Sequence, residues 1–209
     1  MNQPFLSAVI IAYNEAQNIE RCLLSLQAVA DEIVVVDSGS TDDTVMKSES
    51  MGARVLNHPF EGHIQQKNWA ANQAKGQWII SLDADESLGE ELKASLLEWK
   101  KSVHDSRAYR FNRLTSYCGH WVRHGGWYPD QKLRLWKNGA AEWTGENPHD
   151  RLELLAGENA GKSIGHLQGD LLHHSYHTVE DHIRQIAYFS DIAAVHYEGP
   201  LWRTNPWMR

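Results

Sequence analysis

The stretch of sequence that decides the fold is Trp78-Ile79-Ile80-Ser81-Leu82-Asp83-Ala84-Asp85. Its first five residues are almost wholly apolar, which is typical of a strand buried on both faces of a sheet. Two carboxylates, separated by one residue, follow directly. In an open α/β sheet, ligands bind beyond the carboxyl ends of the strands, and carboxylate oxygens suit Mg²⁺ or Mn²⁺. The stretch therefore predicts a metal-bound diphosphate at this edge of the sheet.

Around this stretch, the first hundred residues alternate between strand and helix patterns. Besides the strand at 78–82, the pattern predicts strands at 8–11, 33–36 and 54–56, and helices at 19–29, 41–51, 63–74 and 88–96. Continuous apolar strands that alternate with helices indicate an α/β fold with a parallel sheet covered on both faces. No glycine-rich phosphate loop follows the first strand, which disfavours dinucleotide dehydrogenases and P-loop kinases.

Beyond about residue 105 the pattern changes to half-exposed, antiparallel strands. We expect strands around 109–114, 132–136 and 171–174. A helix should follow, with an apolar face formed by Ile183, Ile186, Ala187, Phe189 and Ala193. The sequence contains no repeat and no linker, so the second half is expected to pack on the first as one domain.

Composition and charge limit the function classes. The chain has 209 residues and a net charge of −7, which argues against a nucleic-acid partner. The first residues lack a basic signal segment, and no stretch approaches the roughly 20 apolar residues that span a bilayer. We therefore expect a cytoplasmic protein. The aromatic and basic residues of 201–209 suggest either contact with the inner face of a membrane or a frayed terminus.

Polar residues also follow the first two predicted strands. Tyr13 and Glu15 come after the first strand, and Asp37 ends the second, so all three are expected at the same edge as the paired carboxylates. Asp37 can accept hydrogen bonds from a nucleobase or a ribose, whereas Tyr13 either stacks on a base or only packs. Ser40 is expected to cap the next helix, with Asp43 three residues on.

Three segments in this order resemble the family 2 glycosyltransferases of the GT-A fold: Ser7–Glu15, Val35–Asp42 and Leu82–Glu86. More narrowly, the chain resembles the bacterial lipopolysaccharide-core glycosyltransferases. That resemblance runs from about residue 6 to residue 196 and includes Trp127–Asp130, Leu133–Leu135, Trp143–Gly145, His149-Asp150 and Leu172–Tyr176. It implies one GT-A domain with a nucleotide-sugar-binding half (1–104), an acceptor-binding and catalytic half (105–200), and a tail (201–209).

The resemblance implies a metal-dependent, inverting transfer of a hexose from a UDP-sugar to a saccharide or glycolipid acceptor, in lipopolysaccharide core or surface glycan synthesis. Tyr13, Glu15 and Asp37 would contact the uridine. Asp83 would touch the ribose or sugar and belongs, with Asp85, to the metal-binding motif for Mg²⁺ or Mn²⁺. The family's further metal ligand is a late histidine, and His173 matches that position best.

Inverting transfer needs a carboxylate that deprotonates the acceptor hydroxyl. Asp150 stands where relatives usually carry a glutamate and is the first candidate for this base; Asp130 is the second. Lys67 and Arg134 either neutralise phosphate charge or are solvated residues on a helix and a strand. Trp121, Trp127 and Trp143 are candidates for an acceptor platform, because aromatic faces stack on the C–H surfaces of sugars, although plain core burial explains each of them equally well.

Two other functions stay open. A sugar nucleotidyltransferase would share the fold, but it needs a glycine-rich basic loop where this chain has Ala12–Glu15. A non-catalytic sugar-binding module with a GT-A core is the other alternative. The acids at Asp37, Asp83 and Asp85 are still present, which argues against a GT-A domain that has lost its catalytic activity.

Overall fold

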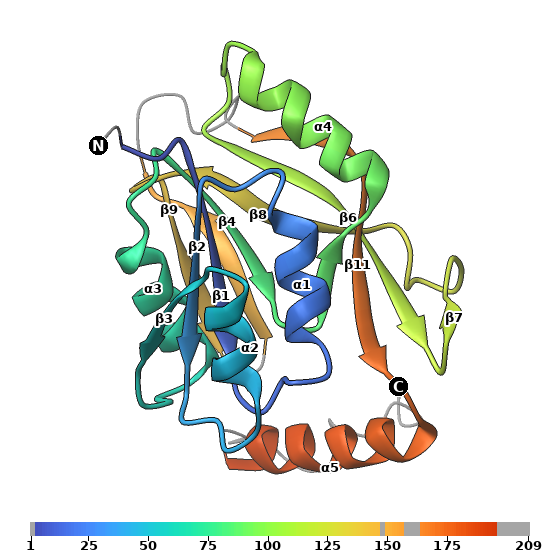
Figure 1. The fold of residues 1–209 in the computed structure, drawn as a ribbon. Coiled ribbons are helices and arrows are strands. Elements are labelled where there is room, and N and C mark those ends of the chain that lie inside the picture. Colours follow the sequence, from blue (N-terminus) through green and yellow to red (C-terminus); the bar gives the residue numbers. More distant parts are fainter. Residues whose placement is uncertain (1–2, 147–148, 157–163, 196–209) are drawn as a thin grey trace.

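A computed structural model describes residues 3–146, 149–156 and 164–195 (Figure 1). Along the chain its elements are β1 (Leu6–Ala12), α1 (Ile19–Leu26), β2 (Glu32–Asp37), α2 (Thr44–Ser50), β3 (Arg54–Asn57), α3 (His63–Gln73), β4 (Trp78–Asp83), β5 (Glu86–Leu88), α4 (Glu90–Lys101), β6 (Ala108–Tyr117), β7 (His120–Trp121), β8 (Asp130–Lys137), β9 (Ala141–Glu146), β10 (His149–Leu154), β11 (Ile164–Tyr176) and α5 (Val179–Val195). The predicted tail, 201–209, falls outside the described residues.

Within the described residues, nine strands form one sheet in the order β3-β2-β1-β4-β8-β6-β11-β5, with β7 paired to β6. The strands β3, β2, β1 and β4 are mutually parallel, as their continuous apolar runs predict. β8 then runs antiparallel to both β4 and β6, while β11 is parallel to β6. β9 and β10 form a separate antiparallel hairpin. The change of sequence pattern near residue 105 therefore marks the change from a parallel to a mixed sheet.

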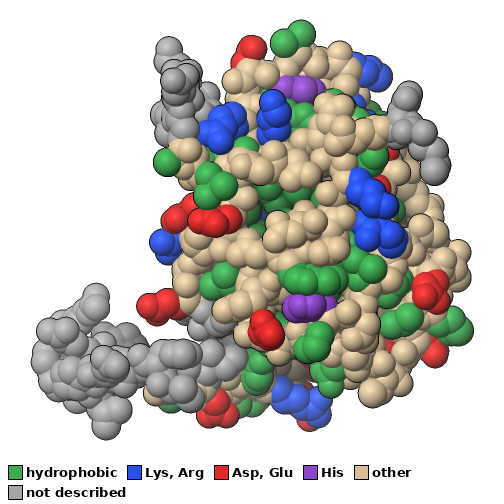
Figure 2. Space-filling view, turned by 90° about the vertical axis from the view of Figure 1, so that its left-hand side faces the viewer, with side chains coloured by type: hydrophobic (Ala, Val, Ile, Leu, Met, Phe, Trp, Pro, Cys, Tyr) green, Lys and Arg blue, Asp and Glu red, His purple; other side chains and the backbone are tan. Residues whose placement is uncertain are grey.

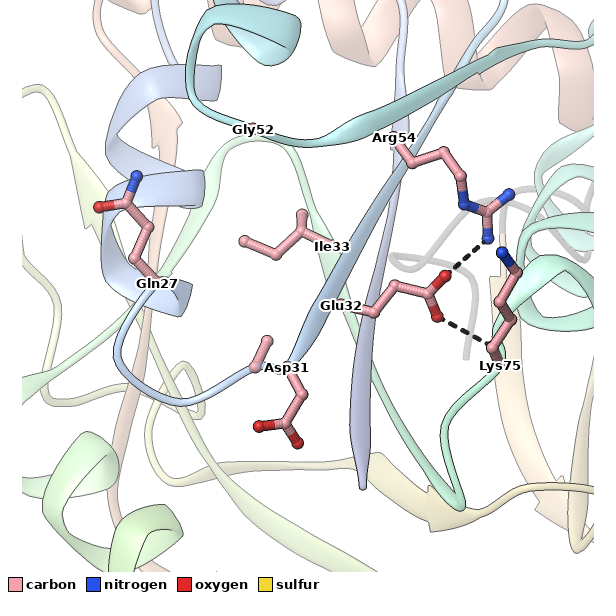
Figure 3. Close-up of a pocket in the computed structure, with 8 residues that line it drawn as sticks. Gln27, Asp31, Glu32, Ile33, Gly52, Arg54 and Lys75 are labelled. Carbon is pink, nitrogen blue, oxygen red and sulfur yellow. Dashed lines mark hydrogen bonds and ion pairs between the residues drawn. The ribbon is translucent and has the colours of Figure 1, made fainter. Parts of the chain in front are cut away.

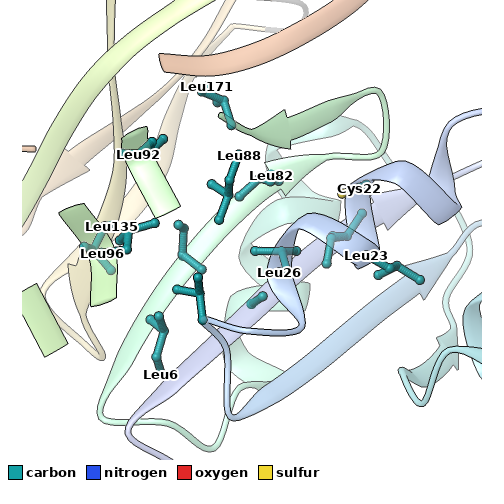
Figure 4. Packing of buried hydrophobic residues seen from close by; sticks show 14 of the residues in the cluster. Leu6, Cys22, Leu23, Leu26, Leu82, Leu88, Leu92, Leu96, Leu135 and Leu171 are labelled. Carbon is teal, nitrogen blue, oxygen red and sulfur yellow. The ribbon is translucent and has the colours of Figure 1, made fainter. Parts of the chain in front are cut away.

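Helices α1 and α4 cover one face of the sheet. Leu23 and Leu26 of α1 and Leu92 of α4 are fully buried against strand residues such as Leu82 and Leu171 (Figure 4). Their helical spacing places these side chains on one stripe that faces the sheet. Cys22 lies in the same buried layer.

Helix α3 and the β9–β10 hairpin cover the opposite face. Ala70 of α3, Trp143 of β9 and Leu152 of β10 are buried there with Val9 and Ile79 of the sheet. On the side of the molecule that Figure 2 shows, acidic and basic side chains are interspersed. No helix among the described residues is long and apolar enough to cross a membrane.

One short strand was missed by the sequence pattern, and it positions the site. We expected Leu88 to begin a helix, but it ends β5, and α4 begins at Glu90. β5 pairs antiparallel with β11, so that Glu86 lies opposite His173. The turn that carries Asp85 is thereby brought against β11. A strand of three residues is too short to show a period of its own, which explains the error.

Candidate functional site

The carboxyl ends of the parallel strands bring the predicted acids to one edge. In the register of the sheet, Ala12 lies beside Asp37, and Ile11 lies beside Asp83. Tyr13, which follows Ala12, has 60% of its surface exposed at this edge. Figure 1 shows the carboxyl ends of β2 and β4 at the same end of the molecule as α5. The fold thus gathers the acid-bearing turns at one end of the sheet.

Asp83 ends β4 and lies between two cations. Its Oδ1 is 3.0 Å from Nζ of Lys67, and its Oδ2 is 2.9 Å from Nη2 of Arg134. Burial alone would raise the pKa of Asp83, but the charges of Lys67 and Arg134 outweigh burial and hold that pKa well below its usual range. Asp83 is therefore a carboxylate at neutral pH, and it holds two cations at the edge of the sheet.

Asp85 lies two residues further on and contacts His173 of β11. Its Oδ2 is 3.2 Å from Nε2 of His173, whose Nδ1 lies 3.3 Å from Oγ1 of Thr115. The backbone N–H of His174 also donates to the carbonyl oxygen of Asp85 at 2.9 Å. Burial lowers the pKa of an imidazole, but the hydrogen bond and charge of Asp85 outweigh it and raise the pKa of His173.

These contacts separate the three predicted metal ligands into two groups. Asp85 and His173 face each other, whereas Asp83 faces Lys67 and Arg134. Among the described residues, no three His, Cys, Asp or Glu side chains converge as a metal cluster. Even so, the carboxylate of Asp85 suits Mn²⁺ or Mg²⁺ when phosphate oxygens and water complete the shell, and the imidazole of His173, 3.2 Å away, can add a nitrogen ligand to a transition metal such as Mn²⁺.

Lys67 also reaches the first candidate base. Its Nζ lies 2.8 Å from Oδ2 of Asp150 and 4.5 Å from the centre of the Trp143 ring. Asn68, the next residue of α3, donates to the carbonyl oxygen of Trp143 and accepts from its N–H, at 2.9 and 2.8 Å. The hairpin is thereby fixed on α3, which places Asp150 beside the same ammonium group as Asp83.

The second candidate base, Asp130, lies at the other end of a chain of ion pairs. Arg134 contacts Glu86 at 3.2 Å, and Arg113 contacts the same Glu86 oxygen at 3.6 Å. Arg113 then contacts Asp130 at 2.8 Å, and Lys132 contacts the other oxygen of Asp130 at 3.0 Å. Sequence reasoning missed Glu86 and Arg113. Glu86 directly follows the two acids of the motif, and this third acid was the signal that could have revealed the chain of ion pairs.

The predicted nucleoside end is built around Asp37, which is buried. Its Oδ2 accepts from the backbone N–H groups of Gly39 and Ser40 at 2.9 and 2.8 Å, and Oδ1 accepts from the Ser40 hydroxyl. Gly39 has φ 89°, a conformation that glycine adopts without strain. Asp37 thus stabilises the turn that follows β2, beside which a nucleoside would bind.

The capping prediction for Ser40 is wrong. Helix α2 begins at Thr44, and its N-cap, Asp43, makes no side-chain cap hydrogen bond. Ser40 Oγ instead donates to Asp37 and accepts from the backbone N–H of Asn14 at 2.8 Å. Ser40 therefore ties the turn after β1 to the turn after β2, a role that short-range pattern reasoning does not see. The neighbouring Glu15 is half-buried, and its burial raises its pKa.

Among the described residues, two of the cavities lie at opposite edges of the sheet. One, of about 380 Å³, is lined by His173, Arg113, Asp130 and Trp127. The other, of about 410 Å³, lies at the amino end of β2, where Glu32 bonds to Arg54 and to the backbone N–H of Lys75 (Figure 3). Only the first cavity adjoins the acids that the sequence selected.

The three tryptophans differ in environment. Trp143 is buried, as the core interpretation expects. Trp121 and Trp127 keep 40% and 39% of their surface exposed, but Trp127 alone of the three lines the cavity beside His173.

Comparison with known proteins agrees with this geometry. Over 88 residues the chain is 49% identical to an uncharacterized glycosyltransferase of Rickettsia bellii, which covers 42% of this chain and 30% of that protein. It is 32% identical over 148 residues to the lipopolysaccharide core biosynthesis glycosyltransferase LpsC of Rhizobium meliloti, covering 66% of this chain and 53% of LpsC. The matches thus span about a third to a half of these relatives.

Among solved structures, residues 1–349 of S. aureus TarS superpose with a TM-score of 0.56 at 19% identity, covering 90% of this chain and 65% of that chain. This likeness supports the α/β GT-A architecture that the sequence predicts. The sequence profile described as glycosyl transferase family 2 matches residues 7–145. The resemblance drawn from the three acidic segments is thus confirmed, and the chain belongs to glycosyl transferase family 2.

Proposed function

We propose that this chain is an inverting, metal-dependent glycosyltransferase that moves a hexose from a UDP-sugar to a saccharide or lipid-linked acceptor. The observation that carries this proposal is the contact between Asp85 and His173, at 3.2 Å, beside the cation-bound Asp83. A carboxylate and an imidazole at the carboxyl edge, next to two cations, form a site for a diphosphate and its metal.

The residues divide the work along the edge. Tyr13, Glu15 and Asp37 bind the uridine, at the end of the edge formed by β1 and β2. Lys67 and Arg134 lie 3.0 and 2.9 Å from Asp83, and they neutralise phosphate charge at this edge. This division assigns residues 1–104 to the donor and 105–200 to the acceptor and the base.

Asp85 and His173 would hold Mg²⁺ or Mn²⁺, with Asp83 adjacent. When bound, such a cation supplies Lewis-acid neutralisation of charge on the departing UDP. Asp85 lies in the turn directly before β5 and His173 lies on β11, so the pairing of β5 with β11 fixes the two side chains beside each other.

Asp150 is the stronger candidate for the base. One of its oxygens contacts Lys67, while Oδ1 has no hydrogen-bond partner among the described residues. Both oxygens of Asp130 are held, one by Arg113 and the other by Lys132. A carboxylate oxygen that carries no cation is the better acceptor for the proton of the attacking hydroxyl. That hydroxyl then displaces UDP in one step, with inversion at the anomeric carbon.

Relatives support the finer proposal. The similarity to LpsC points to lipopolysaccharide core or surface glycan synthesis. TarS has been crystallised with UDP-GlcNAc, in a structure that superposes with a TM-score of 0.53. We place the activity in the cytoplasm, at the inner face of the membrane, where a glycolipid acceptor would be met.

The test is calorimetric titration of UDP with and without MnCl₂ into wild-type protein and Asp85→Ala. Wild-type protein should bind UDP at least about tenfold more tightly with Mn²⁺, and Asp85→Ala should lose that gain. Binding that is equal in both proteins would refute the proposal. Release of pyrophosphate from a nucleoside triphosphate and a sugar phosphate would instead establish a nucleotidyltransferase.

A further inference from the structure

The turn that follows β1 carries an exposed aromatic ring. Tyr13 keeps 60% of its surface exposed, so the ring is not a core side chain. Among the described residues, it makes no hydrogen bond and no contact with another ring. The position of the Tyr13 ring is therefore set by the backbone of the turn that carries it.

Asn14 gives this turn its shape. Its φ is 54°, in the left-handed region that residues other than glycine rarely adopt and that asparagine tolerates better than most. The chain bends at Tyr13 and Asn14, directly after β1 ends at Ala12. Because the chain turns back at Asn14, Tyr13 stays at the outside of the turn, whereas Glu15, after the bend, is half-buried.

Asn14 is bonded to the turn after β2 through both its backbone and its side chain. Its N–H donates to Oγ of Ser40 at 2.8 Å, and its Oδ1 accepts from the backbone N–H of Thr41 at 2.8 Å. An alanine at this position would lose the bond to Thr41 and would be strained at a positive φ. A glycine would lose the same bond but adopt that φ without strain.

The two other proposed uridine ligands are held by other contacts. The N–H of Glu15 donates to Oγ1 of Thr44 at 2.8 Å, and its Oε2 accepts from the side chain of Asn18 at 2.8 Å. Asp37 is held within its own turn by the N–H groups of Gly39 and Ser40. The side chain of Asn14 takes part in neither set of contacts, so its loss should fall mainly on Tyr13.

We infer that Asn14 is a positioning residue for nucleotide binding. Its left-handed backbone and its bond to Thr41 hold the ring of Tyr13 outward, as a face on which the base of the nucleotide stacks. A ring that is already in place lowers the entropic cost of binding. The inference rests on the proposed function, since it takes UDP as the nucleotide.

The experiment is calorimetric titration of two probes with MnCl₂: UDP, and pyrophosphate, which has no base. Tyr13→Ala should weaken UDP binding at least about fivefold, the lower end for a lost base–aromatic stack. Asn14→Ala should cause a similar loss, and Asn14→Gly a smaller one. Pyrophosphate should bind equally to all of these proteins. Gln17→Ala is the matched control, because Gln17 is exposed in the same turn and its side chain makes no hydrogen bond among the described residues.

The double variant Tyr13→Ala/Asn14→Ala separates positioning from general damage to the turn. It should bind UDP no more weakly than Tyr13→Ala alone, because Asn14 acts through the ring that is already missing. The same cycle with Asn14→Gly tests the bond to Thr41 in an unstrained backbone, and so serves even where Asn14→Ala does not fold.

Three results would overturn the inference: UDP binding by Asn14→Ala equal to the wild type, losses that multiply in the double variant, or weaker binding of pyrophosphate by Asn14→Ala. Absence of UDP binding by the wild-type protein would count against the proposed function instead.

Discussion

The two edges of the parallel sheet both carry carboxylates paired with cations, yet the pairs differ in kind. At the amino edge, Glu32 accepts from Ser7, from Arg54 and from the backbone N–H of Lys75, so both of its oxygens are used to join elements (Figure 3). At the carboxyl edge, Asp85 contacts one imidazole, and Asp150 contacts one ammonium group. Charge clusters alone do not mark a site; what distinguishes the carboxyl edge is that Asp85 and Asp150 each keep an oxygen without a partner among the described residues, whereas Glu32 does not.

The sharpest way to break this comparison is Asp150→Asn. The amide cannot take the proton of the acceptor hydroxyl, so kcat should fall by about 10²–10⁴-fold while the donor KM stays unchanged. The measurement is release of UDP from a UDP-sugar in the presence of acceptor. Asp130→Asn should retain far more of kcat, because both of its oxygens are already held by cations. The reverse ranking of the two variants would move the base to Asp130.

The next effect concerns stability at the carboxyl edge. Glu86 is fully buried and contacts both Arg134 and Arg113. Glu86→Gln leaves two guanidinium groups with less compensation and should cost about 3 kcal/mol, the lower end for a broken buried pair, because Asp83 and Asp130 remain. In a chain of this size that is a fall in Tm of roughly 6–12 °C.

The control for this variant is Glu98→Gln. The ion pair of Glu98 with Lys101 is exposed to solvent, so Glu98→Gln should leave Tm unchanged. An unchanged Tm in Glu86→Gln would show that the chain of ion pairs does not hold β5 in place.

The parallel half of the fold could be predicted from the sequence because each of its elements shows its own period. Continuous apolar runs give β1, β2 and β4, and the acids that follow them must meet at one edge. Asp37 and Asp83 were placed in this way, without knowledge of any contact. The local sequence pattern is sufficient to place a residue where the direction of its strand alone determines the edge at which the residue lies.

The rest of the site could not be predicted, because it depends on contacts between distant segments. From the sequence, Lys67 is either a phosphate ligand or a solvated helix residue. Only the fold shows that it also joins Asp83 to Asp150, which is 83 positions away from Lys67 along the chain. Glu86 and Arg113 look like solvated residues until β5 pairs with β11. Charged side chains in half-exposed strands carry no periodic signal of their partner, so the order of β8, β6 and β11 could not be read in advance.

A smaller effect is expected where the hairpin is fixed to α3. Asn68→Ala removes both hydrogen bonds to the backbone of Trp143, at a cost of about 1–3 kcal/mol. Because Asp150 is carried by that hairpin, kcat should fall severalfold while UDP binding stays intact. Gln65→Ala, an exposed change on the same helix, should affect neither quantity. If kcat of Asn68→Ala equals that of the wild type, Lys67 alone positions the hairpin.

The smallest effect belongs to the amino edge and depends on pH. Burial would raise the pKa of Glu32, but hydrogen bonds from Ser7, the Lys75 backbone and Arg54 lower it from 4.5. A carboxyl group with a lowered pKa adds stability above the unfolded-state value and loses it as pH falls through the folded-state value. Glu32→Gln should therefore be less stable than wild type at pH 7, and the two urea midpoints should converge as the pH falls through the lowered folded-state pKa of Glu32. The kcat of Glu32→Gln should match that of the wild type. Glu49→Gln, a substitution at an exposed residue, should leave the urea midpoint unchanged at both neutral and acidic pH. A loss of kcat in Glu32→Gln would mean that the amino edge is coupled to the site, and the contrast between the two edges would fail.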